Sequence, residues 1–459
     1  MKLAIDLFSG AGGMSEGILQ AGFHIIFSSD KSPEASLTYT NRHQQLGLIQ
    51  GKNTWFENTD IKDLTGEFIF EKIKSLEAFK NSDIFDKKNP IDAIFGGPPC
   101  QGFSRSGKRD PKDPRNFLFR EYLRVIDEVK PKYVVMENVE GMLDMKLYID
   151  GLRGATYENE TVPNILKAEF KAIGYHTLEP TVIDASDFGV PQGRRRVILM
   201  AYLDGEKEPC YPVAICDDSN KVTILEAIGD LIENKKLREE LNPNLTNYQI
   251  ESRKGRTAAI EGNEIIPNHE FSRHTSIVSE RFSLYREGED ANALRRRIKR
   301  EGIDISNHEN LISYVEKEVE KLAVNTSVDI SIELSAIIDE ILNDRDYIVK
   351  VFKKPDCDDK LIDCLLTKKN SRTRLDKSKP ALTVMTIADD YISPFEDRTF
   401  TVRELARLQS FDDSFEFLGK RTTGGHRRRL EVPQYTQVGN AVPPLLAKAI
   451  ASEIIKALD

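Results

Sequence analysis

Hydrophobic and polar positions alternate along the N-terminal part of the chain in a pattern typical of an α/β sheet. Short apolar runs over 3–8, 25–28, 91–95 and 133–136 have the length of buried strands. Amphipathic stretches such as Phe117–Val129 lie between them and have helical spacing. Because short strands alternate with helices, we predict a doubly wound, mainly parallel sheet.

The pattern changes in the middle of the chain. Charge density rises over 203–371, and residues 276–345 have mainly helical spacing. Regular motifs return over 372–459, which ends in a helix with an apolar face. We therefore predict an α/β domain made of 1–202 and 372–459, and a second, smaller domain made of 203–371.

Two further segments carry local signals. Residues 67–90 are charged and helix-prone, and we predict an insertion over the edge of the sheet. Thr401 and Glu404 have the spacing of a capping box, so a helix is predicted to begin just after Thr401.

Composition limits the classes of protein that the chain can belong to. It has 459 residues and a formal net charge of −9. Its five cysteines are odd in number and form no C-x-x-C pair, which argues against a disulfide framework or a zinc site. The N-terminal apolar run is too short for a signal peptide, and no run approaches the ~20 residues that span a bilayer. We expect a cytoplasmic protein with no metal and no membrane segment.

Three basic clusters stand out against this acidic background, namely Arg194–Arg196, Arg295–Arg300 and Arg427–Arg429. A single cluster of this kind is usually a solvated face. Together they could line a groove that faces the phosphates of a nucleic acid, with the acidic residues on the opposite side.

Polar residues follow the first strands, at the edge of the sheet where ligands bind in such folds. The glycine loop Ser9–Gly13 lies between a strand and a helix, where bare backbone can approach a ligand. Asp30 follows Gly10 by 20 residues, the spacing at which a carboxylate takes ribose hydroxyls. Asp60 could present a carboxylate to an adenine amino group. Ser15 breaks the G-x-G-x-x-G pattern of dinucleotide binding, which disfavours NAD without excluding it.

Cys100 lies directly after a buried strand, in the stretch G-G-P-P-C. The glycines allow a tight turn and the prolines stiffen it, so the thiol is predicted to stand on a rigid loop. A lone cysteine can equally be a buried structural residue, and its position alone leaves both interpretations open.

Taken together, five motifs resemble those of the DNA (cytosine-5) methyltransferases, in the order in which that family has them. They are D-L-F-S-G-A-G-G at Asp6–Gly13, G-P-P-C-Q-G-F-S at Gly97–Ser104, E-N-V at Glu137–Val139, Q-G-R-R-R at Gln192–Arg196 and G-N-A-V at Gly439–Val442. The chain most resembles the bacterial type II restriction-modification branch. The resemblance implies a Rossmann-like methyltransferase fold, with 203–371 as the target-recognition domain.

The resemblance also implies a mechanism. Cys100 would add to C6 of a cytosine that is flipped out of the duplex, which makes C5 nucleophilic. Glu137 would hold N3 and the exocyclic amine of the base. Arg196 would contact the base O2, and Arg194 would lie near Cys100, so that both stabilise the anionic adduct.

The implied methyl donor is S-adenosylmethionine. The residues expected to bind it are Phe8, Ser9, Gly10, Gly12 and Gly13 around the methionine moiety, Asp30 at the ribose, Asp60, Ile61 and Leu118 at the adenine, and Asn440 and Val442 at the carboxyl-terminal side. Lys31 departs from the family pattern, which usually has an apolar residue there.

The implied partner is double-stranded DNA, bound by a monomer, with a cognate restriction endonuclease that acts on the same site. A tRNA cytosine-5 methyltransferase would keep the fold and change the substrate, but 203–371 is large for that branch. A catalytically silent DNA-binding protein is a second alternative, although Cys100, Glu137, Arg194 and Arg196 are all present. An NAD-dependent enzyme is the third.

Overall fold

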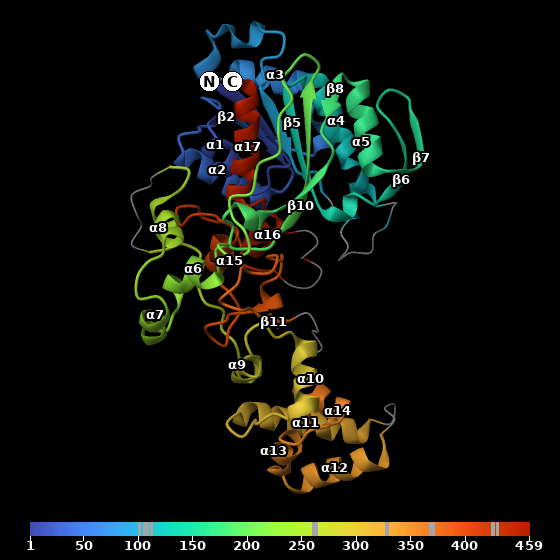
Figure 1. Ribbon diagram of the computed structural model, residues 1–459, viewed down its shortest axis with the longest axis vertical. Coiled ribbons are helices and arrows are strands. Elements are labelled where there is room, and N and C mark those ends of the chain that lie inside the picture. The colour runs from blue at the N-terminus through green and yellow to red at the C-terminus, as the bar shows by residue number, and fades with distance from the viewer. Residues whose placement is uncertain are drawn as a thin grey trace.

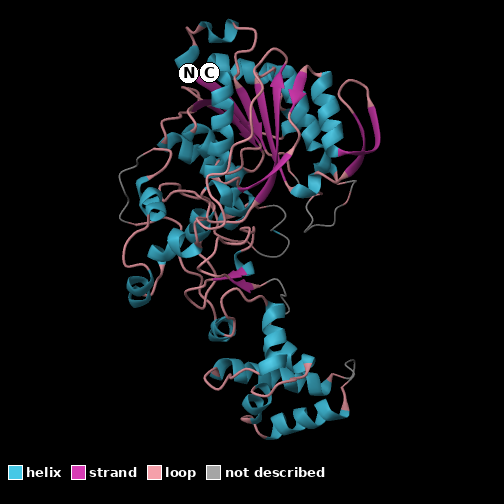
Figure 2. Ribbon diagram, viewed as in Figure 1, coloured by secondary structure: helices cyan, strands magenta, loops and turns pink. Residues whose placement is uncertain are grey.

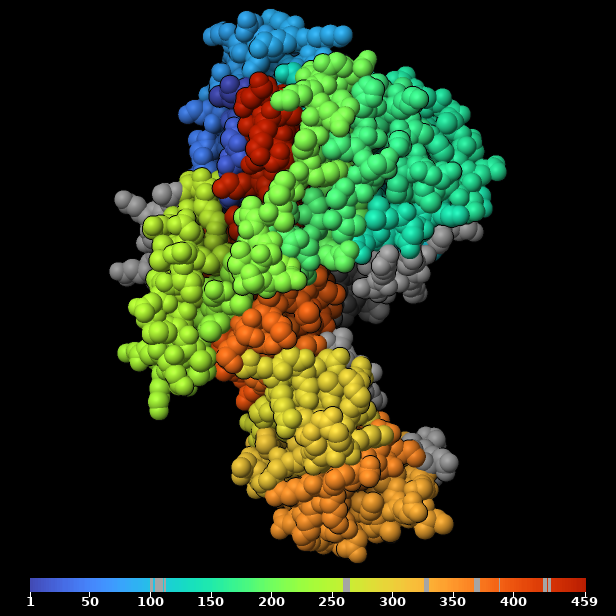
Figure 3. All heavy atoms as spheres, viewed as in Figure 1, coloured from blue at the N-terminus to red at the C-terminus, as the bar shows by residue number. Residues whose placement is uncertain are grey.

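The computed structural model describes residues 1–99, 102–103, 110, 113–258, 265–325, 330–366, 372–423, 427 and 431–459. The upper body holds a central sheet with helices on both faces, and the lower lobe is helical (Figures 1 and 2). In the space-filling view this lobe, in yellow and orange, joins the rest of the molecule through a narrower region (Figure 3).

One sheet of eight strands organises the upper body. In spatial order its strands are β3 (Trp55–Asn58), β2 (Phe23–Asp30), β1 (Lys2–Leu7), β4 (Ala93–Gly96), β5 (Tyr133–Asn138), β10 (Arg195–Leu203) and β8 (Tyr175–Thr177), with β9 (Thr181–Asp184) also paired to β10. The five strands from β3 to β5 are parallel, and β10 runs antiparallel to β5, β8 and β9. The predicted doubly wound, mainly parallel sheet is confirmed.

Helices cover both faces of this sheet. On one face lie α3 (Gly66–Ser75), α4 (Leu118–Val129) and α5 (Val162–Ala172), and on the other lie α1 (Gly13–Gln20) and α17 (Pro444–Leu458). Helix α2 (Pro33–Gln45) follows β2 and packs beside β2 and β3. Along β1, Leu3 and Ile5 face the first group of helices, whereas Ala4 faces the second. This alternation explains the continuous apolar run in the sequence, because a strand buried on both faces needs apolar residues at every position.

The prediction of an insertion over 67–90 is wrong for its first part. Residues 66–75 form α3, which connects β3 to β4 and packs against α4. Ile69 and Ile73 are fully buried in the core, whereas Glu67 and Glu71 face solvent. The charged residues therefore occupy the outer face of an ordinary crossover helix.

A hairpin that the sequence analysis missed leaves the sheet after β5. Its strands are β6 (Lys146–Asp150) and β7 (Thr156–Thr161), which pair antiparallel to each other. Several positions along both strands are polar and exposed, so the apolar run that marks the central strands is absent from this segment.

Two further cores lie below the sheet. The first combines α6 (Ile224–Ile228) with α15 (Val402–Leu408) and α16 (Gln434–Asn440), and α7 (Lys235–Leu241) and α8 (Asn247–Lys254) pack around it. The second belongs to the lower lobe, which consists of α9 (Ser276–Ser283), α10 (Ala291–Glu301), α11 (Glu309–Val324), α12 (Ile332–Asn343), α13 (Tyr347–Phe352) and α14 (Asp359–Leu365). A short sheet of β11 (Thr373–Arg374) and β12 (Tyr391–Ile392) lies between the two. The predicted helical character of 276–345 is confirmed for the described residues, as is the capping box of Thr401 and Glu404 at α15.

The two ends of the chain meet in the packing of α1 against α17 (Figure 1). A Cβ at Gly17 would lie 2.4 Å from the backbone nitrogen of Lys448 and 2.5 Å from Cβ of Ala447. Only glycine therefore permits the two helices to approach this closely. Within the described part of the chain, no helix has both the length and the apolar character needed to cross a membrane.

This contact predicts that Gly17→Ala destabilises the protein, although alanine is the better helix former by about 1 kcal/mol. The added methyl group has no space against α17, and overpacking of this kind costs about 1–3 kcal/mol. The better helix propensity offsets about 1 kcal/mol of this cost, so we expect the free energy of unfolding, measured by urea titration, to fall by up to about 2 kcal/mol. Ser452→Ala on the outer side of α17 is the control and should change it by less than about 0.5 kcal/mol. A Gly17→Ala variant as stable as the parent would contradict the packing argument.

Candidate active site

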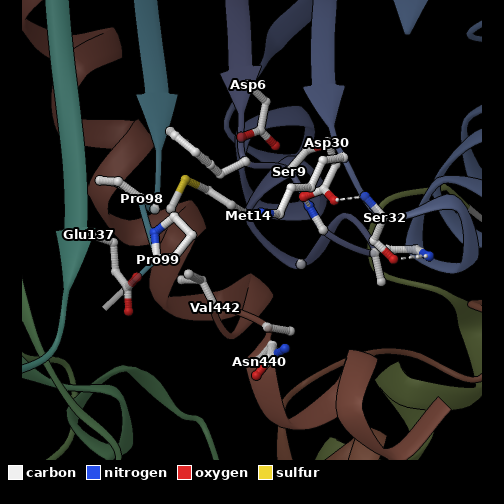
Figure 4. Close-up of a pocket in the computed structure, with 18 of the residues that line it drawn as sticks. Asp6, Ser9, Met14, Asp30, Ser32, Pro98, Pro99, Glu137, Asn440 and Val442 are labelled. Atoms are coloured by element: carbon white, nitrogen blue, oxygen red, sulfur yellow. Dashed lines mark hydrogen bonds between the residues drawn. The ribbon is translucent and has the colours of Figure 1, made fainter. Parts of the chain in front are cut away.

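A cavity of about 360 Å³ lies at the carboxyl ends of β1, β2, β4 and β5 (Figure 4). Parallel strands bring their following loops together at this edge of the sheet. Most of the predicted site residues line it, namely Phe8, Ser9, Gly10, Gly13, Asp30, Asp60, Ile61, Leu118, Glu137, Arg194, Arg196, Asn440 and Val442. Gly12 does not contribute to the wall.

The glycine loop after β1 owes its shape to two glycines with left-handed backbone. Gly10 has φ +54° and Gly12 has φ +103° as the N-cap of α1. Gly12 packs against the Tyr39 ring, since a Cβ there would lie 3.2 Å from it. A Cβ at Gly13 would lie 2.5 Å from the carbonyl oxygen of Val442. Gly12 therefore lets the loop pack against Tyr39. Gly13 lets the segment at Val442, which forms part of the cavity wall, approach the loop closely.

Asp30 joins the loops that follow β1 and β2. Its carboxylate accepts hydrogen bonds from the backbone N–H groups of Gly10 and Ser32, each at 2.8 Å (Figure 4). Burial raises the pKa of Asp30, and these hydrogen bonds partly oppose that shift. The carboxylate is thus held in one orientation at the cavity wall, with unused lone pairs for a further donor.

Asp60 and Lys31 lie at the same end of the cavity. Asp60 caps a 3₁₀ turn at Ile61–Asp63 by accepting from the N–H of Lys62 at 3.2 Å. The Lys31 ammonium is 3.9 Å from the Asp60 carboxylate, and the Lys31 side chain is largely exposed. Lys31, which departs from the family pattern, therefore contributes a charge beside Asp60 as well as an aliphatic stem.

Glu137 and Arg196 form an ion pair at the other end. They lie on the neighbouring strands β5 and β10, and Nε of Arg196 is 2.8 Å from Oε1 of Glu137. Both side chains are 13% exposed. Gly97 leaves room for this carboxylate, because a Cβ there would lie 3.1 Å from Oε2 of Glu137. A planar guanidinium and a carboxylate thus stand together at the cavity wall.

Arg194 also lines the cavity and is buried, with 3% of its surface exposed. Its guanidinium donates to the carbonyl oxygens of Val384, at 3.3 Å, and Gly439, at 3.0 Å. Arg194 therefore lines the cavity and also holds two distant segments of the chain together.

Cys100 lies outside the described residues, and so do Arg428 and Arg429. Pro98 and Pro99, which precede Cys100, line the cavity near Glu137 (Figure 4). The carbonyl oxygen of Pro98 accepts from the amide of Asn138 at 3.2 Å. The described start of the loop is therefore tied to the end of β5.

Many of the arginines in the clusters at 194–196 and 295–300 are paired with carboxylates within the fold. Arg195 pairs with Glu140 at 2.5 Å, and Arg295 pairs with Asp359 at 3.1 Å and with Asp363. Arg297 is buried and pairs with Glu289 at 2.7 Å, so the prediction that this residue faces a phosphate is wrong. Arginine side chains cannot lose their proton, and in this acidic chain they find carboxylates within the fold instead.

Asp6 is a cavity residue to which the sequence analysis assigned no role. It is 1% exposed, accepts a hydrogen bond from the Ser15 hydroxyl, and lines the cavity near the end of β1 (Figure 4). Ser15 Oγ also lies 3.0 Å from the Tyr39 hydroxyl. Burial raises the pKa of the Asp6 carboxyl to about 7. The sequence did show Asp6 at the head of the glycine-loop motif, but not that its carboxyl would be enclosed. Other unassigned wall residues are Ala11, Met14, Ser29, Ser32, Ala35, Thr59, Val139, Val432, Gln437 and Ala441.

Comparison with known proteins identifies the class. The model of the C-5 cytosine-specific DNA methylase family matches residues 3–456, so the chain belongs to that family. It is 31% identical over 459 residues to the type II methyltransferase M.DdeI of Desulfomicrobium norvegicum, covering 98% of this chain and 88% of that protein. It is 28% identical to the type II methyltransferase M.AgeI of Thalassovita gelatinovora, over 99% of each chain. The prediction of a DNA cytosine methyltransferase of the bacterial type II kind is confirmed.

A solved structure agrees with the fold. A crystal structure described as a prophage-encoded DNA modification methyltransferase from E. coli matches 100% of this chain and 99% of its own, with a TM-score of 0.58 at 21% identity. The overall fold of the chain therefore resembles one already observed in a crystal.

The buried Asp6 carboxyl predicts a specific dependence of stability on pH. Its pKa is about 7 in the folded protein and 3.8 in a solvated carboxyl, so the folded state binds the proton more tightly. This contribution to the free energy of unfolding is complete below pH 3.8 and is lost as the pH rises through about 7. Asp6→Asn keeps an acceptor for Ser15 and removes the titration. We expect the free energy of unfolding of the variant, minus that of the parent, to increase with pH by up to ~1.4 kcal/mol per pH unit between pH 4 and 7.

Urea titrations at several pH values measure this difference. Asp63→Asn, at an exposed carboxyl in the neighbouring 3₁₀ turn, is the matched control and should leave the difference nearly constant with pH. A difference between Asp6→Asn and the parent that is equally flat would show that Asp6 is ionised in the folded protein.

Proposed function

We propose that this chain transfers a methyl group from S-adenosylmethionine to C5 of a cytosine in a specific sequence of double-stranded DNA. The proposal is carried by one observation. A single cavity is lined at one end by Asp30 and Asp60, and at the other end by Glu137 and Arg196. A cofactor site and a base site that share one cavity allow direct transfer between the two ligands.

The residues present suit S-adenosylmethionine. The carboxylates of Asp30 and Asp60 are acceptors for the ribose hydroxyls and the adenine amine. The backbone of the loop at Ser9 and Gly10 would border the methionine moiety, with Asn440 and Val442 on the opposite side. When bound, this cofactor supplies an electrophilic methyl group on a sulfonium. A cavity with several carboxylates favours such a cation.

The protein groups would act on the cytosine ring in the following way. The thiolate of Cys100 forms a bond to C6, and the electron pair of the C5–C6 double bond becomes available at C5. Glu137 accepts from the exocyclic amine and holds N3 through a proton shared between its carboxyl and the ring, and Arg196 approaches O2, so both stabilise the charge that develops on the ring. C5 takes the methyl group and leaves the sulfonium sulfur as a neutral thioether. Water then accepts the C5 proton, the C5–C6 double bond re-forms, and the C6–sulfur bond breaks to release the Cys100 thiolate.

The ion pair between Glu137 and Arg196 supports this assignment of roles. Each side chain limits the rotation of the other, so both are oriented before a base enters. For Arg194 we propose a place beside the adduct. Its hydrogen bonds to Val384 and Gly439 support a fixed position for its guanidinium.

The target base lies inside a duplex, so we propose that it is flipped into the cavity. Residues 203–371 would read the sequence, and 1–202 with 372–459 would perform the chemistry. We further propose that the enzyme acts as a cytoplasmic monomer and that a restriction endonuclease recognises the same site.

The experiment that tests the proposed function is methylation-resolved sequencing of DNA from cells that express this chain. We expect 5-methylcytosine at one recurrent sequence, and its loss with Cys100→Ser, since removal of a nucleophile lowers the rate by ~10³-fold or more. Duplex that carries 5-fluorocytosine at that sequence should trap a covalent adduct with the parent and none with Cys100→Ser. Unmodified DNA in cells that contain folded protein would refute the proposal, and methylated tRNA in the same cells would favour the RNA alternative.

The space beside Glu137 yields a second test. Gly97→Ala places a methyl group 3.1 Å from Oε2 of Glu137, so the carboxylate must move by a few tenths of an ångström. We expect methyl transfer to slow by about 10- to 100-fold, because reacting groups tolerate little misplacement. Gly193→Ala is the matched control, since its Cβ would have a nearest neighbour at 3.9 Å. Equal single-turnover rates for the two variants would argue against a role for the Glu137 carboxylate.

A further inference from the structure

Two buried glutamines meet where the segment before β10 contacts the carboxyl-terminal part of the chain. Gln192 precedes β10, Gln409 follows α15, and both side chains are 0% exposed. Nε2 of Gln192 donates to Oε1 of Gln409 at 2.9 Å and to the carbonyl oxygen of Leu408 at 3.2 Å. Gln192 belongs to the Q-G-R-R-R motif, but the proposed mechanism gives it no role.

The other ends of the two amides reach backbone groups of irregular segments. Oε1 of Gln192 accepts from the N–H of Val384 at 2.7 Å. Nε2 of Gln409 donates to the carbonyl oxygen of Val438 at 2.8 Å. Each glutamine therefore uses both its donor and its acceptor, and none of these contacts belongs to a helix or sheet ladder.

Arg194 completes the same network. Gln192 accepts from the N–H of Val384, and Arg194 donates to the carbonyl oxygen of the same residue, Val384, at 3.3 Å. Gln409 and Arg194 bind the carbonyl oxygens of the consecutive residues Val438 and Gly439. The start of β10, the segment around Val384 and the end of α16 are thus fixed relative to one another.

Directional contacts are needed here because packing alone does not set the orientation of irregular backbone. A buried amide that loses a hydrogen-bond partner is left unsatisfied away from water, so alternative arrangements of these segments are disfavoured. The fixed segments lead directly to functional groups. Two and four residues after Gln192 come Arg194 and Arg196, and the segment held by Gln409 continues into Asn440 and Val442 at the cavity wall.

We propose that Gln192 and Gln409 are positioning residues for methyl transfer, with separate effects. Gln192 orients the segment that carries Arg194 and, at the start of β10, Arg196, and so acts on the chemical step. Gln409 orients the wall that carries Asn440 and Val442, and so acts on cofactor binding. This inference rests on the proposed function.

The test uses the full-length protein with the isosteric variants Gln192→Met and Gln409→Met. Single-turnover rates with saturating S-adenosylmethionine and duplex DNA report the chemical step, and calorimetric titration gives the Kd of the cofactor. We expect Gln192→Met to slow methyl transfer by about tenfold or more while the Kd changes by less than about twofold. We expect Gln409→Met to raise the Kd by about tenfold.

Gln249→Met is the matched control. Gln249 is also 0% exposed, and its amide donates to the carbonyl oxygen of Leu225 at 3.2 Å and accepts from the N–H of Thr246 at 3.0 Å, away from the cavity. If the two glutamines serve stability alone, all three variants will melt at lower temperature and keep the parent's rate and Kd. That result would overturn the inference.

Gln192→Glu provides a readout that does not depend on the methionine variant folding well. The carboxylate keeps the acceptor for Val384 and lacks the donor, and protonation restores a donor. Since burial raises the pKa of a carboxyl, we expect the rate of this variant, relative to the parent, to recover as the pH falls. If the rate of Gln192→Glu divided by the rate of the parent stays near one at every pH, the role of Gln192 is contradicted.

Failure of the inference can be told from failure of the proposed function. If the parent protein produces no 5-methylcytosine, the function is wrong whatever the variants do. If the parent is active and the glutamine variants match Gln249→Met, only the positioning role is wrong.

Discussion

The packing of the last helix against the first is the contact on which the cavity depends. Gly17 lets α17 lie directly on α1, and Gly13 lets the chain at Val442 reach the glycine loop. The two ends of the chain thereby form adjoining walls of one cavity, although the sequence separates them by the whole protein. Without this close approach the loops after β1 and β2 would have no opposite wall, and a cofactor would remain exposed to solvent.

Irregular segments, rather than strands, form much of the site, and buried polar side chains hold them. Arg42 in α2 pairs with Glu16 in α1 at 2.7 Å and with Asp412 at 3.6 Å. Arg407 in α15 pairs in the same way with Asp230 and Asp413. A buried pair adds little stability over an apolar one, but to remove one partner costs several kcal/mol. Such pairs therefore specify one arrangement, as the Gln192–Gln409 network does at the cavity.

Local sequence patterns were sufficient to predict most of the sheet and many of the residues that line the cavity. The parallel strands, the helix after Thr401 and the place of Asp30 all depend on neighbours in sequence, and the structure agrees with each. Residues 66–75 were misjudged because their charges dominate the composition, whereas two isoleucines determine the burial of α3. The boundaries at 202/203 and 371/372 stay a prediction. Helix α6, from the predicted second domain, shares one hydrophobic core with α15 and α16 of the predicted α/β domain, so the change of composition along the chain does not mark a boundary in space.

By itself, the sequence determined which chemical groups the protein has and which strand ends carry them, because strand period, glycine turns and motif spacing are local properties. Tertiary structure alone decided which of those groups meet. It paired Arg196 with Glu137, turned Arg297 inward onto Glu289 and enclosed Asp6. Charge partners and burial depend on distances between segments remote in the chain, and such distances are set only when the core has packed.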